Sequence, residues 1–523
     1  MKNRTHATVE VLDTTLRDGE QTPGVAFTPA EKLEIARLLL NHLHVDRLEI
    51  ASARVSVGES AAVRSIINWA QKRECSGQLE ILGCVDGGRS VEWIRNVGGE
   101  VLNLLAKGSE HHCRVQLRKT PARHRDDLCR EIETAVNAGL GVNVYLEDWS
   151  NGMRSNFAYV YDLVERLRQL PVERFMLADT LGVLTPRDVA RYMEWMLSAF
   201  PDLHFDFHGH NDYGMATANA LAAVNAGALG VHATINGLGE RAGNLTLAQL
   251  TVAVNDLSEH RVRIAEKELQ HASDVVQTLS GKRCAWNMPV VGSDVYTQTC
   301  GVHADGDKKG DLYANALAPE RFGRRRDYAL GKLSGKASID RNIEQMGLDR
   351  ELDPELRRKV LDEVIRLGDK KKHSTAADLP FIVAGVMRAP VNQRIRIVDF
   401  EVKSHFHAAP KAKVVLEVDG RRIETSAAGD GGYDAFVKAL KKGLKGFGLS
   451  MFNLLDYEVR IPPGGRTDAL VEATITWAIG DGRTMVTTGV DSDQLVAAVM
   501  ATEKILNHVA DTELPVPAPD RRD

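Results

Sequence analysis

The amino-acid sequence, 523 residues long, predicts an α/β fold class: a (β/α)8 TIM barrel, then helical subdomains, then a C-terminal α+β domain. Two observations predict the barrel. Short runs rich in β-formers alternate with helix-like segments from residue 8 to about 258, and polar residues gather where these runs end. The eight runs are residues 9–16, 47–52, 79–85, 101–106, 142–148, 174–180, 204–210 and 230–237.

Helix-start signals lie between the runs. Residues 28–31, TPAE, combine a threonine N-cap, a proline at the first helical position and a glutamate three residues after the cap. Residues 185–186, TP, open another helix in the same way, and residues 159–170 carry an apolar stripe of helical period. An open doubly wound sheet is the alternative fold. It would need a glycine-rich phosphate loop after the first strand, where residues 16–21 read LRDGEQ.

Composition narrows the class of protein. A hydrophobic content of 43% and a charged content of 26% are typical of a soluble globular chain, and the length suggests two to four domains. The net charge of -5 argues against nucleic acid or an acidic membrane surface as partner. Six cysteines without CxxC spacing indicate reduced thiols. Only MKNRTHA precedes the first run, and no apolar stretch reaches membrane-spanning length, so we expect a cytoplasmic chain.

A histidine pair ends the seventh run. His208 and His210 project to the same side of a strand, because strand side chains alternate faces with period 2. A strand can present a chelating pair in this way. The alternative is a strand that merely has two histidines at its solvated end. The positions of other candidate ligands decide between the two interpretations.

Those other candidates lie at the carboxyl ends of the runs, where barrel enzymes carry their reactive groups. The polar residues at or near these ends are Arg17, Asp18, Glu49, Glu147, Asp148, Asp179 and Thr180, with Asn244 after the eighth run. Closure of a barrel makes the eighth strand a neighbour of the first. Asp18, the histidine pair and Asn244 can therefore reach one point, although Asp148 and Asp212 also fit as solvated or N-capping groups.

Such a donor set suits a divalent metal. Two neutral imidazoles, one carboxylate and an amide oxygen fit Zn²⁺, Mn²⁺ or Mg²⁺ with coordination positions left open. An open site can chelate a 2-oxo acid through its carbonyl and carboxylate oxygens and polarise the carbonyl. Arg17 is then well placed to meet the alkoxide that develops there.

Three long motifs carry a family resemblance: LDTTLRDGEQTPG at 12–24, HGHNDYGMATANALAAVNAGA at 208–228 and TINGLGERAGN at 234–244. They resemble the metal-dependent Claisen-condensing acyltransferases, namely the 2-isopropylmalate, citramalate and homocitrate synthases, and the resemblance runs over nearly the whole chain. It implies condensation of acetyl-CoA with a 2-oxo acid, followed by thioester hydrolysis. The implied metal ligands are Asp18, His208 and His210, with Asn244 on or near the metal. The implied electrophilic stabiliser is Arg17, with Glu147 and Thr180 against the substrate.

The segment 301–313 resembles the family's post-barrel subdomain, which is expected to reach over the mouth of the site in the same or a second protomer. Abstraction of a proton from the acetyl methyl group needs a base close to the carbonyl. His303 is the candidate base or proton relay, with Glu147 tuning it and Tyr313 as a further polar contact. The alternative is that His303 only orders the loop.

Residues at the ends of runs three to six determine which 2-oxo acid is accepted. By resemblance the pocket is lined by Leu82, Leu105, Tyr145, Glu147 and Thr180, a combination that looks like the citramalate synthases, which take pyruvate. Bulky side chains at two of these positions, Leu105 and Tyr145, would reject a branched substrate by steric overlap. A methylene group is worth only ~1–3 kcal/mol, so a 2-isopropylmalate synthase that takes 2-oxoisovalerate is the alternative, followed by a pyruvate-dependent aldolase or lyase.

The expected domains are a barrel at 1–280, helical linker subdomains covering the active site at 281–390, a regulatory domain at 391–512 and a disordered tail at 513–523. Strand-like runs at 395–406, 412–420, 454–462, 469–479 and 485–490 are interspersed with helix-like runs at 433–444 and 492–509. This part resembles the allosteric, dimerising domain of isopropylmalate and citramalate synthases. The resemblance implies a homodimer and an amino-acid effector, isoleucine or leucine, from branched-chain amino-acid biosynthesis.

Overall fold

The computed structural model describes residues 8–299, 302–303, 306, 310, 312–345, 352–369, 378–379, 382–383, 386, 394–460, 471–479 and 484–513. It divides into two compact units, Met1–Tyr296 with Asn315–Arg325, and Thr297–Ala314 with Arg326–Asp523, and each is described by itself. The expected disordered tail lies, from residue 514 onward, outside the described residues. The domain boundaries given above remain predictions.

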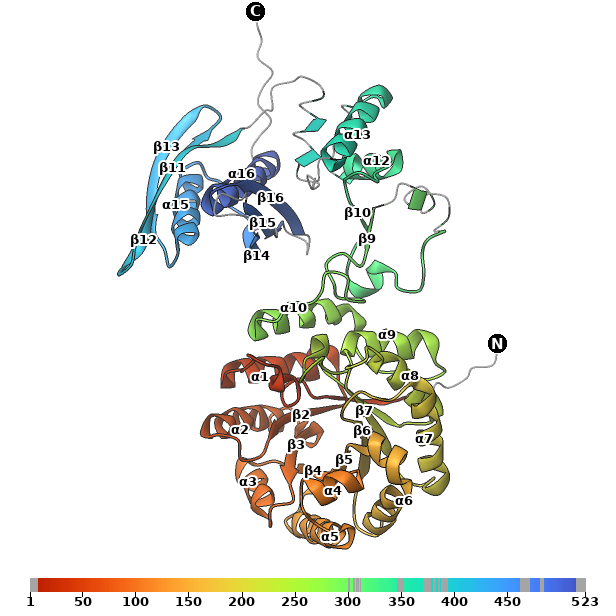
Figure 1. Cartoon of the computed structure of the whole chain (residues 1–523). Coiled ribbons are helices and arrows are strands. Elements are labelled where there is room, and N and C mark those ends of the chain that lie inside the picture. The colour runs from red at the N-terminus through yellow and green to blue at the C-terminus, as the bar shows by residue number, and fades with distance from the viewer. Residues whose placement is uncertain are drawn as a thin grey trace, which may run out of the picture. The chain divides into compact units, whose positions relative to one another are not determined.

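The first unit is a closed barrel of eight parallel strands in chain order (Figure 1). Hydrogen bonding between the first and eighth strands closes the barrel, so the predicted (β/α)8 fold is confirmed. The strands are β1 (Glu10–Asp13), β2 (Arg47–Ser52), β3 (Leu79–Cys84), β4 (Val101–Lys107), β5 (Gly141–Glu147), β6 (Arg174–Asp179), β7 (Phe205–Gly209) and β8 (Gly230–Ala233).

Helices surround the barrel, as Figure 1 shows. Both predicted helix starts are present as capping boxes, at Thr28 with Glu31 and at Thr185 with Asp188. The helices are α1 (Pro29–Arg37), α2 (Val57–Gln71), α3 (Arg89–Val97), α4 (Glu110–Val115), α5 (Pro121–Asn137), α6 (Trp149–Leu167), α7 (Pro186–Ala199), α8 (Ala216–Ala226), α9 (Leu247–Leu257) and α10 (Leu269–Ser280).

Strand alternation builds two different interiors. In β5 the side chains of Val142, Val144 and Leu146 join the large apolar core between strands and helices. The intervening Asn143 and Tyr145 bond to side chains of β4 and β8 inside the barrel, the first to Asn103 and the second to His232. The space between strands and helices is therefore apolar, whereas the inside of the barrel holds several buried polar groups.

The first and last strands are shorter than predicted. The backbone N–H of Thr14 still bonds to Ala233 of β8, at 2.9 Å, but the Asp13 carboxylate then accepts the N–H of Thr15 at 2.8 Å and turns the chain out of the sheet. After β8 the chain enters a 3₁₀ turn, Ile235–Gly237, with Asn236 at φ 58°. The chain therefore bends after β1 and again after β8, and both bends lie at the carboxyl end of the barrel.

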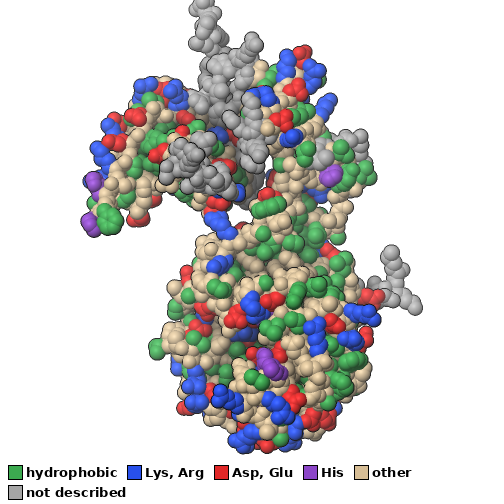
Figure 2. Space-filling view, in the orientation of Figure 1, with side chains coloured by type: hydrophobic (Ala, Val, Ile, Leu, Met, Phe, Trp, Pro, Cys, Tyr) green, Lys and Arg blue, Asp and Glu red, His purple; other side chains and the backbone are tan. Residues whose placement is uncertain are grey.

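The second unit begins with a small part made of two short strands and two helices. Strands β9 (Thr297–Gln298) and β10 (Asp327–Tyr328) pair in parallel, and helices α12 (Lys336–Gln345) and α13 (Pro354–Asp369) pack together in a separate apolar cluster. No helix in the described part of the chain combines the length and the apolar character needed to cross a bilayer. On the face drawn in Figure 2, Lys and Arg side chains are interspersed with Asp and Glu side chains.

The C-terminal part contains two three-stranded antiparallel sheets, each with a helix packed on it. The elements are β11 (Ile395–His405), β12 (Ala408–Val418), β13 (Arg421–Ala428), α15 (Gly432–Gly446), β14 (Asn453–Arg460), β15 (Val471–Ala478), β16 (Thr484–Asp491) and α16 (Gln494–Glu513). The α+β prediction is confirmed, but it lacked β13. The pair Asp419-Gly420, at φ 46° and 79°, forms the tight turn before this strand, and that dipeptide was the available signal.

Candidate active site

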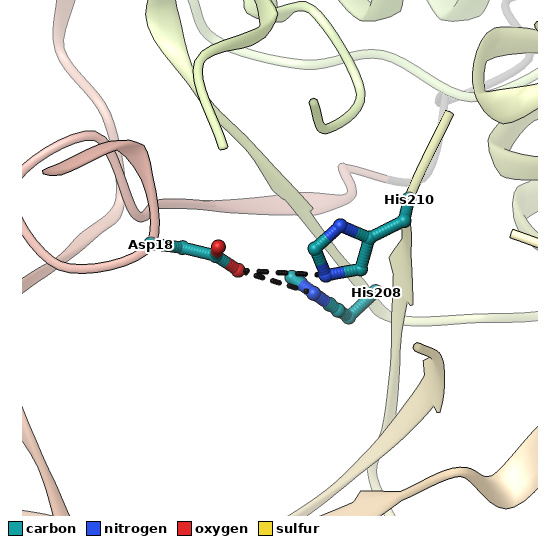
Figure 3. A group of neighbouring side chains, drawn as sticks. All are labelled: Asp18, His208 and His210. Carbon is teal, nitrogen blue, oxygen red and sulfur yellow. Dashed lines mark ion pairs between the residues drawn. The ribbon is translucent and has the colours of Figure 1, made fainter. Parts of the chain in front are cut away.

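The carboxyl end of β7 and the loop after β1 bring three potential metal ligands together. The Nε2 atom of His208 lies 3.4 Å from an Asp18 carboxylate oxygen, and that of His210 lies 3.8 Å from the same oxygen (Figure 3). Donor atoms of all three buried residues lie within 4.8 Å of one another. Elsewhere in the described chain, no other trio of His, Cys, Asp or Glu side chains meets this criterion.

A buried lysine fixes the loop that carries Asp18. Lys32 on α1 is fully buried, and its ammonium group lies 2.6 Å from carboxylate oxygens of both Glu20 and Glu59. The same ammonium also donates to the carbonyl of Leu16 at 3.4 Å. Because Leu16 and Glu20 flank Asp18 along the chain, this one side chain ties the ligand loop to both α1 and α2.

Burial favours the neutral form of both histidine rings. Burial lowers the pKa of His208 well below its ordinary value, and the nearby His210, His232 and Arg17 act in the same direction. Burial also lowers the pKa of His210, which outweighs the opposing effect of the Asp18 carboxylate. A neutral imidazole has a lone pair available for a metal ion.

Unpartnered oxygen atoms complete the donor set. Among the described residues, Oδ1 of Asp18 and Oδ1 of Asn244 are buried and have no hydrogen-bond partner. Asn244 pairs with His210 through an isolated β-bridge, and its amide nitrogen donates to Leu238. Buried polar atoms are rarely left unsatisfied, so these two oxygens are available to a ligand. Two imidazole nitrogens with carboxylate and amide oxygens fit a divalent cation such as Zn²⁺, Mn²⁺ or Mg²⁺.

Arg17 places a fixed positive charge beside these ligands. Its guanidinium donates to Glu49 at 2.6 Å and to the Tyr145 hydroxyl at 3.3 Å, and it lies 3.4 Å from Asp18. Burial opposes the charge, but the carboxylates of Glu49 and Asp18 outweigh it and raise the pKa of Arg17. The sequence suggested that Glu49 lies near the end of β2, but it lies in the middle of the strand. Its carboxylate meets Arg17 from inside the barrel.

The three predicted apolar pocket residues lie together. Leu82, Leu105 and Tyr145 form one cluster with Leu12 and Met176, separate from the large core around the barrel. Tyr145 is only 3% exposed. Since its hydroxyl reaches Arg17, this cluster adjoins the charged groups described above. The site thus combines a small apolar wall with the Arg17 guanidinium and with side chains of the kinds that bind metal ions.

Glu147 and Thr180 are engaged by neighbours at the strand ends. Glu147, the last residue of β5, forms an ion pair with Lys107, the last residue of β4. The Thr180 hydroxyl accepts the backbone N–H of Asp148 at 2.8 Å. The sequence-based assignment missed Lys107 because the predicted strand stopped one residue earlier, although the rule that reactive groups end the strands would have selected it.

A second arginine joins three loops at the same end of the barrel. Arg241 lies 2.8 Å from Asp212 and donates to the backbone carbonyl of Thr180 at 2.7 Å. Asp212 is thus held in an ion pair after β7, and Asp148 precedes α6 without a side-chain cap. These contacts connect the loops after β6, β7 and β8.

The predicted base and its partner belong to the second unit. The rings of His303 and Tyr313 lie 4.2 Å apart at 32°, and both side chains are exposed. Residues 304–305, 307–309 and 311 lie outside the described residues. The two rings form a local pair, and their role at the barrel site stays a prediction.

Comparisons with known proteins cover almost the whole chain. Family models described as HMGL-like, homocitrate synthase post-HMGL domain-like and LeuA allosteric (dimerisation) domain match residues 8–276, 290–372 and 373–510. A Methanopyrus kandleri protein provisionally named (R)-citramalate synthase CimA is 35% identical over 94% of this chain and 94% of its own. The (R)-citramalate synthase CimA of Methanocaldococcus jannaschii is 33% identical over 89% of this chain and 92% of its own. A second M. kandleri protein, provisionally named 2-isopropylmalate synthase, is 33% identical over 96% and 98%.

Replacing one predicted ligand tests the metal assignment. The substitution His208→Ala removes one of two imidazole donors, so the metal content of the purified protein, measured by plasma mass spectrometry after dialysis, is expected to fall at least about tenfold. The matched control is His111→Ala, which removes an exposed histidine from α4 and should leave the metal content unchanged. Equal metal content in both variants would contradict the assignment.

Proposed function

We propose a reaction for this chain on the premise that it belongs to the family of the (R)-citramalate and 2-isopropylmalate synthases, with an HMGL-like barrel and a LeuA-type C-terminal domain. It is an acyltransferase of the kind that condenses acetyl-CoA with a 2-oxo acid. The 2-oxo acid is pyruvate. The products are citramalate and free CoA.

The cluster of Leu82, Leu105 and Tyr145 carries the choice of pyruvate. The Tyr145 hydroxyl bonds to Arg17, which lies against the candidate metal ligand Asp18, so the apolar wall stands close to the expected carbonyl position. A methyl group needs little space against such a wall. An isopropyl group would crowd the tyrosine ring and the two leucines, and this favours the smaller substrate by steric overlap.

The residues divide the chemistry between them. Asp18, His208, His210 and Asn244 would hold a divalent cation, which when bound polarises the 2-oxo carbonyl as a Lewis acid. Arg17 stabilises the negative charge that develops on the carbonyl oxygen, and the low exposure of its side chain, 9%, strengthens this effect. The Lys107 ammonium pairs with Glu147 at the end of β5, and we expect Glu147 to face the substrate from there.

His303 is assigned as the base. It takes a proton from the acetyl methyl group, and the resulting carbon attacks the keto carbon of pyruvate, so that a C–C bond forms as the carbonyl becomes an alkoxide. The imidazolium of His303 then returns the proton to the alkoxide. Water attacks the thioester carbonyl, the C–S bond breaks, and CoA leaves as the thiol. Tyr313, whose ring lies 4.2 Å from that of His303, is a further polar contact.

A second candidate function is 2-isopropylmalate synthesis from 2-oxoisovalerate. It is favoured by one relative provisionally named for that activity, which is 33% identical to this chain over 98% of its own length. A pyruvate-dependent aldolase or lyase would use a similar donor set, but it would not release CoA from acetyl-CoA.

Substrate choice is tested by CoA release. With acetyl-CoA saturating, kcat/KM is measured through thiol formation for pyruvate, 2-oxobutyrate and 2-oxoisovalerate in parallel. We expect pyruvate to exceed 2-oxoisovalerate at least about tenfold, because each additional methylene must displace the pocket wall. A higher value for 2-oxoisovalerate would reverse the choice between the two synthases, and no CoA release with any acid would reject both.

The role of His303 is tested by two substitutions at one position. His303→Ala should lower kcat by about 10²–10⁴-fold and leave the KM for pyruvate nearly unchanged, since the base acts on the other substrate. His303→Gln keeps a polar side chain for ordering the loop, so it should be equally slow. The matched control is Val302→Ala, which alters a neighbouring exposed side chain and should retain normal turnover. Normal turnover in His303→Gln would assign the residue to loop order alone.

The C-terminal domain supports amino-acid regulation of a dimer, since residues 373–510 match the LeuA allosteric (dimerisation) domain. The effector for a citramalate-forming enzyme is isoleucine. Isoleucine at millimolar concentration should lower the rate of CoA release more than leucine does, and light scattering should give the mass of two chains. Stronger inhibition by leucine would instead support the isopropylmalate assignment.

A further inference from the structure

A row of hydrogen-bonded polar side chains crosses the barrel behind the pocket. TIM barrels usually fill this space with branched apolar residues. Here Tyr145 of β5, His232 of β8 and Asp206 of β7 are at most 3% exposed. The burial of such polar groups costs free energy unless each is hydrogen-bonded, so their presence inside the barrel calls for a functional explanation. The reaction steps described above use Tyr145 but neither His232 nor Asp206.

Distances define the order of the row. The Tyr145 hydroxyl lies 2.9 Å from Nδ1 of His232, and Nε2 of His232 lies 3.1 Å from Oδ2 of Asp206. Beyond it, Asp206 forms an ion pair with Arg47, while its other carboxylate oxygen lies 2.9 Å from Nε2 of His204. The Asp206 carboxylate is therefore anchored on the side away from the pocket.

These contacts assign the hydrogens. A carboxylate only accepts, so Nε2 of His232 carries the hydrogen directed at Asp206, and we assign to Nδ1 the lone pair that accepts from Tyr145. The single hydroxyl hydrogen of Tyr145 then points to His232. The lone pairs of the hydroxyl oxygen remain for Arg17, whose Nη2 lies 3.3 Å away. The Tyr145 hydroxyl thus donates its hydrogen to His232 and accepts one from Arg17.

Glu49 is a second, more distant partner that competes for the same hydroxyl. A carboxylate oxygen of Glu49 lies 3.5 Å from the same hydroxyl, and a freed hydroxyl hydrogen would turn toward that charge. Closing this 3.5 Å contact to an ordinary hydrogen-bond length would draw the ring toward β2 and away from its present place with Leu82 and Leu105 in the pocket cluster. The position of the pocket wall thus depends on an imidazole on β8, across the barrel interior from β5.

We propose that His232 and Asp206 are positioning residues for substrate selectivity, which act by holding the Tyr145 hydroxyl from behind so that its ring keeps the pocket small. This inference rests on the proposed function, because it names what sets the substrate range of that same site. Neither residue needs to touch the 2-oxo acid.

The experiment compares selectivity in four variants of the full-length enzyme: Tyr145→Phe, His232→Leu, the double variant and His232→Asn. The ratio of kcat/KM for pyruvate to that for 2-oxobutyrate is measured in each. We expect the first two to lower the ratio about three- to tenfold, chiefly through a higher KM for pyruvate. Because both act on one hydroxyl, the double variant should fall no further than either single variant. His232→Asn keeps an acceptor near the position of Nδ1 and should restore most of the ratio.

Metal content is measured in every variant, because the His232 ring lies 5.4 Å from that of His208 and its loss could disturb that ligand. The control for lost stability is Asn219→Ala, which removes a buried hydrogen bond between α8 and the Leu184 carbonyl and should leave the ratio unchanged. Thermal unfolding of each variant is compared with this control.

Additive losses in the double variant, or an unchanged ratio in Tyr145→Phe, would overturn the inference. The second of these results does not depend on whether the His232 variants fold. Either result leaves wild-type CoA release from pyruvate intact, and with it the proposed function. A wild-type enzyme that releases CoA with neither acid would overturn the proposed function and this inference together.

Discussion

Hydrogen bonding between β1 and β8 is the constraint on which the rest of the barrel unit depends. The register pairs Asp13 with Ala233, and one further bond, from Thr14 to Ala233, carries the pairing to the point where β1 leaves the sheet. The loop after β1 then bends back over β8, where the Thr15 hydroxyl accepts the N–H of Ile235 at 2.8 Å. Without this closure, Asp18 and the histidine pair would lie at opposite edges of an open sheet.

Cationic side chains near this seam are paired with carboxylates. Arg17 is shared between Glu49 and Asp18, and Lys32 is shared between Glu20 and Glu59. Removal of one partner from a buried pair is costly, whereas an intact pair roughly balances its own desolvation. Asp18 and Asn244 each keep one oxygen without a hydrogen-bond partner, and both residues adjoin His210.

The sequence predicted what depends on local pattern and on strand ends. The run at 47–52 coincides with β2, and the meeting of Asp18 with His208 and His210 followed from their places after β1 and at the end of β7. It did not predict the roles of residues whose function depends on side-chain contacts with other strands. Lys107 fell one residue beyond its predicted strand, and His232 looked like an ordinary strand residue because its partners Tyr145 and Asp206 are 87 and 26 positions away.

The Lys32 contacts bear on when the ligand loop becomes ordered. Fixing the backbone of a residue costs about 1–2 kcal/mol in conformational entropy. Since the lysine holds the chain on both sides of Asp18, this cost is met once, during folding, rather than at each encounter with a metal ion. The free energy of metal capture can then appear almost entirely as affinity. The first turn of α1 would thus contribute to retention of a metal ion at the candidate ligands, although it supplies none of them.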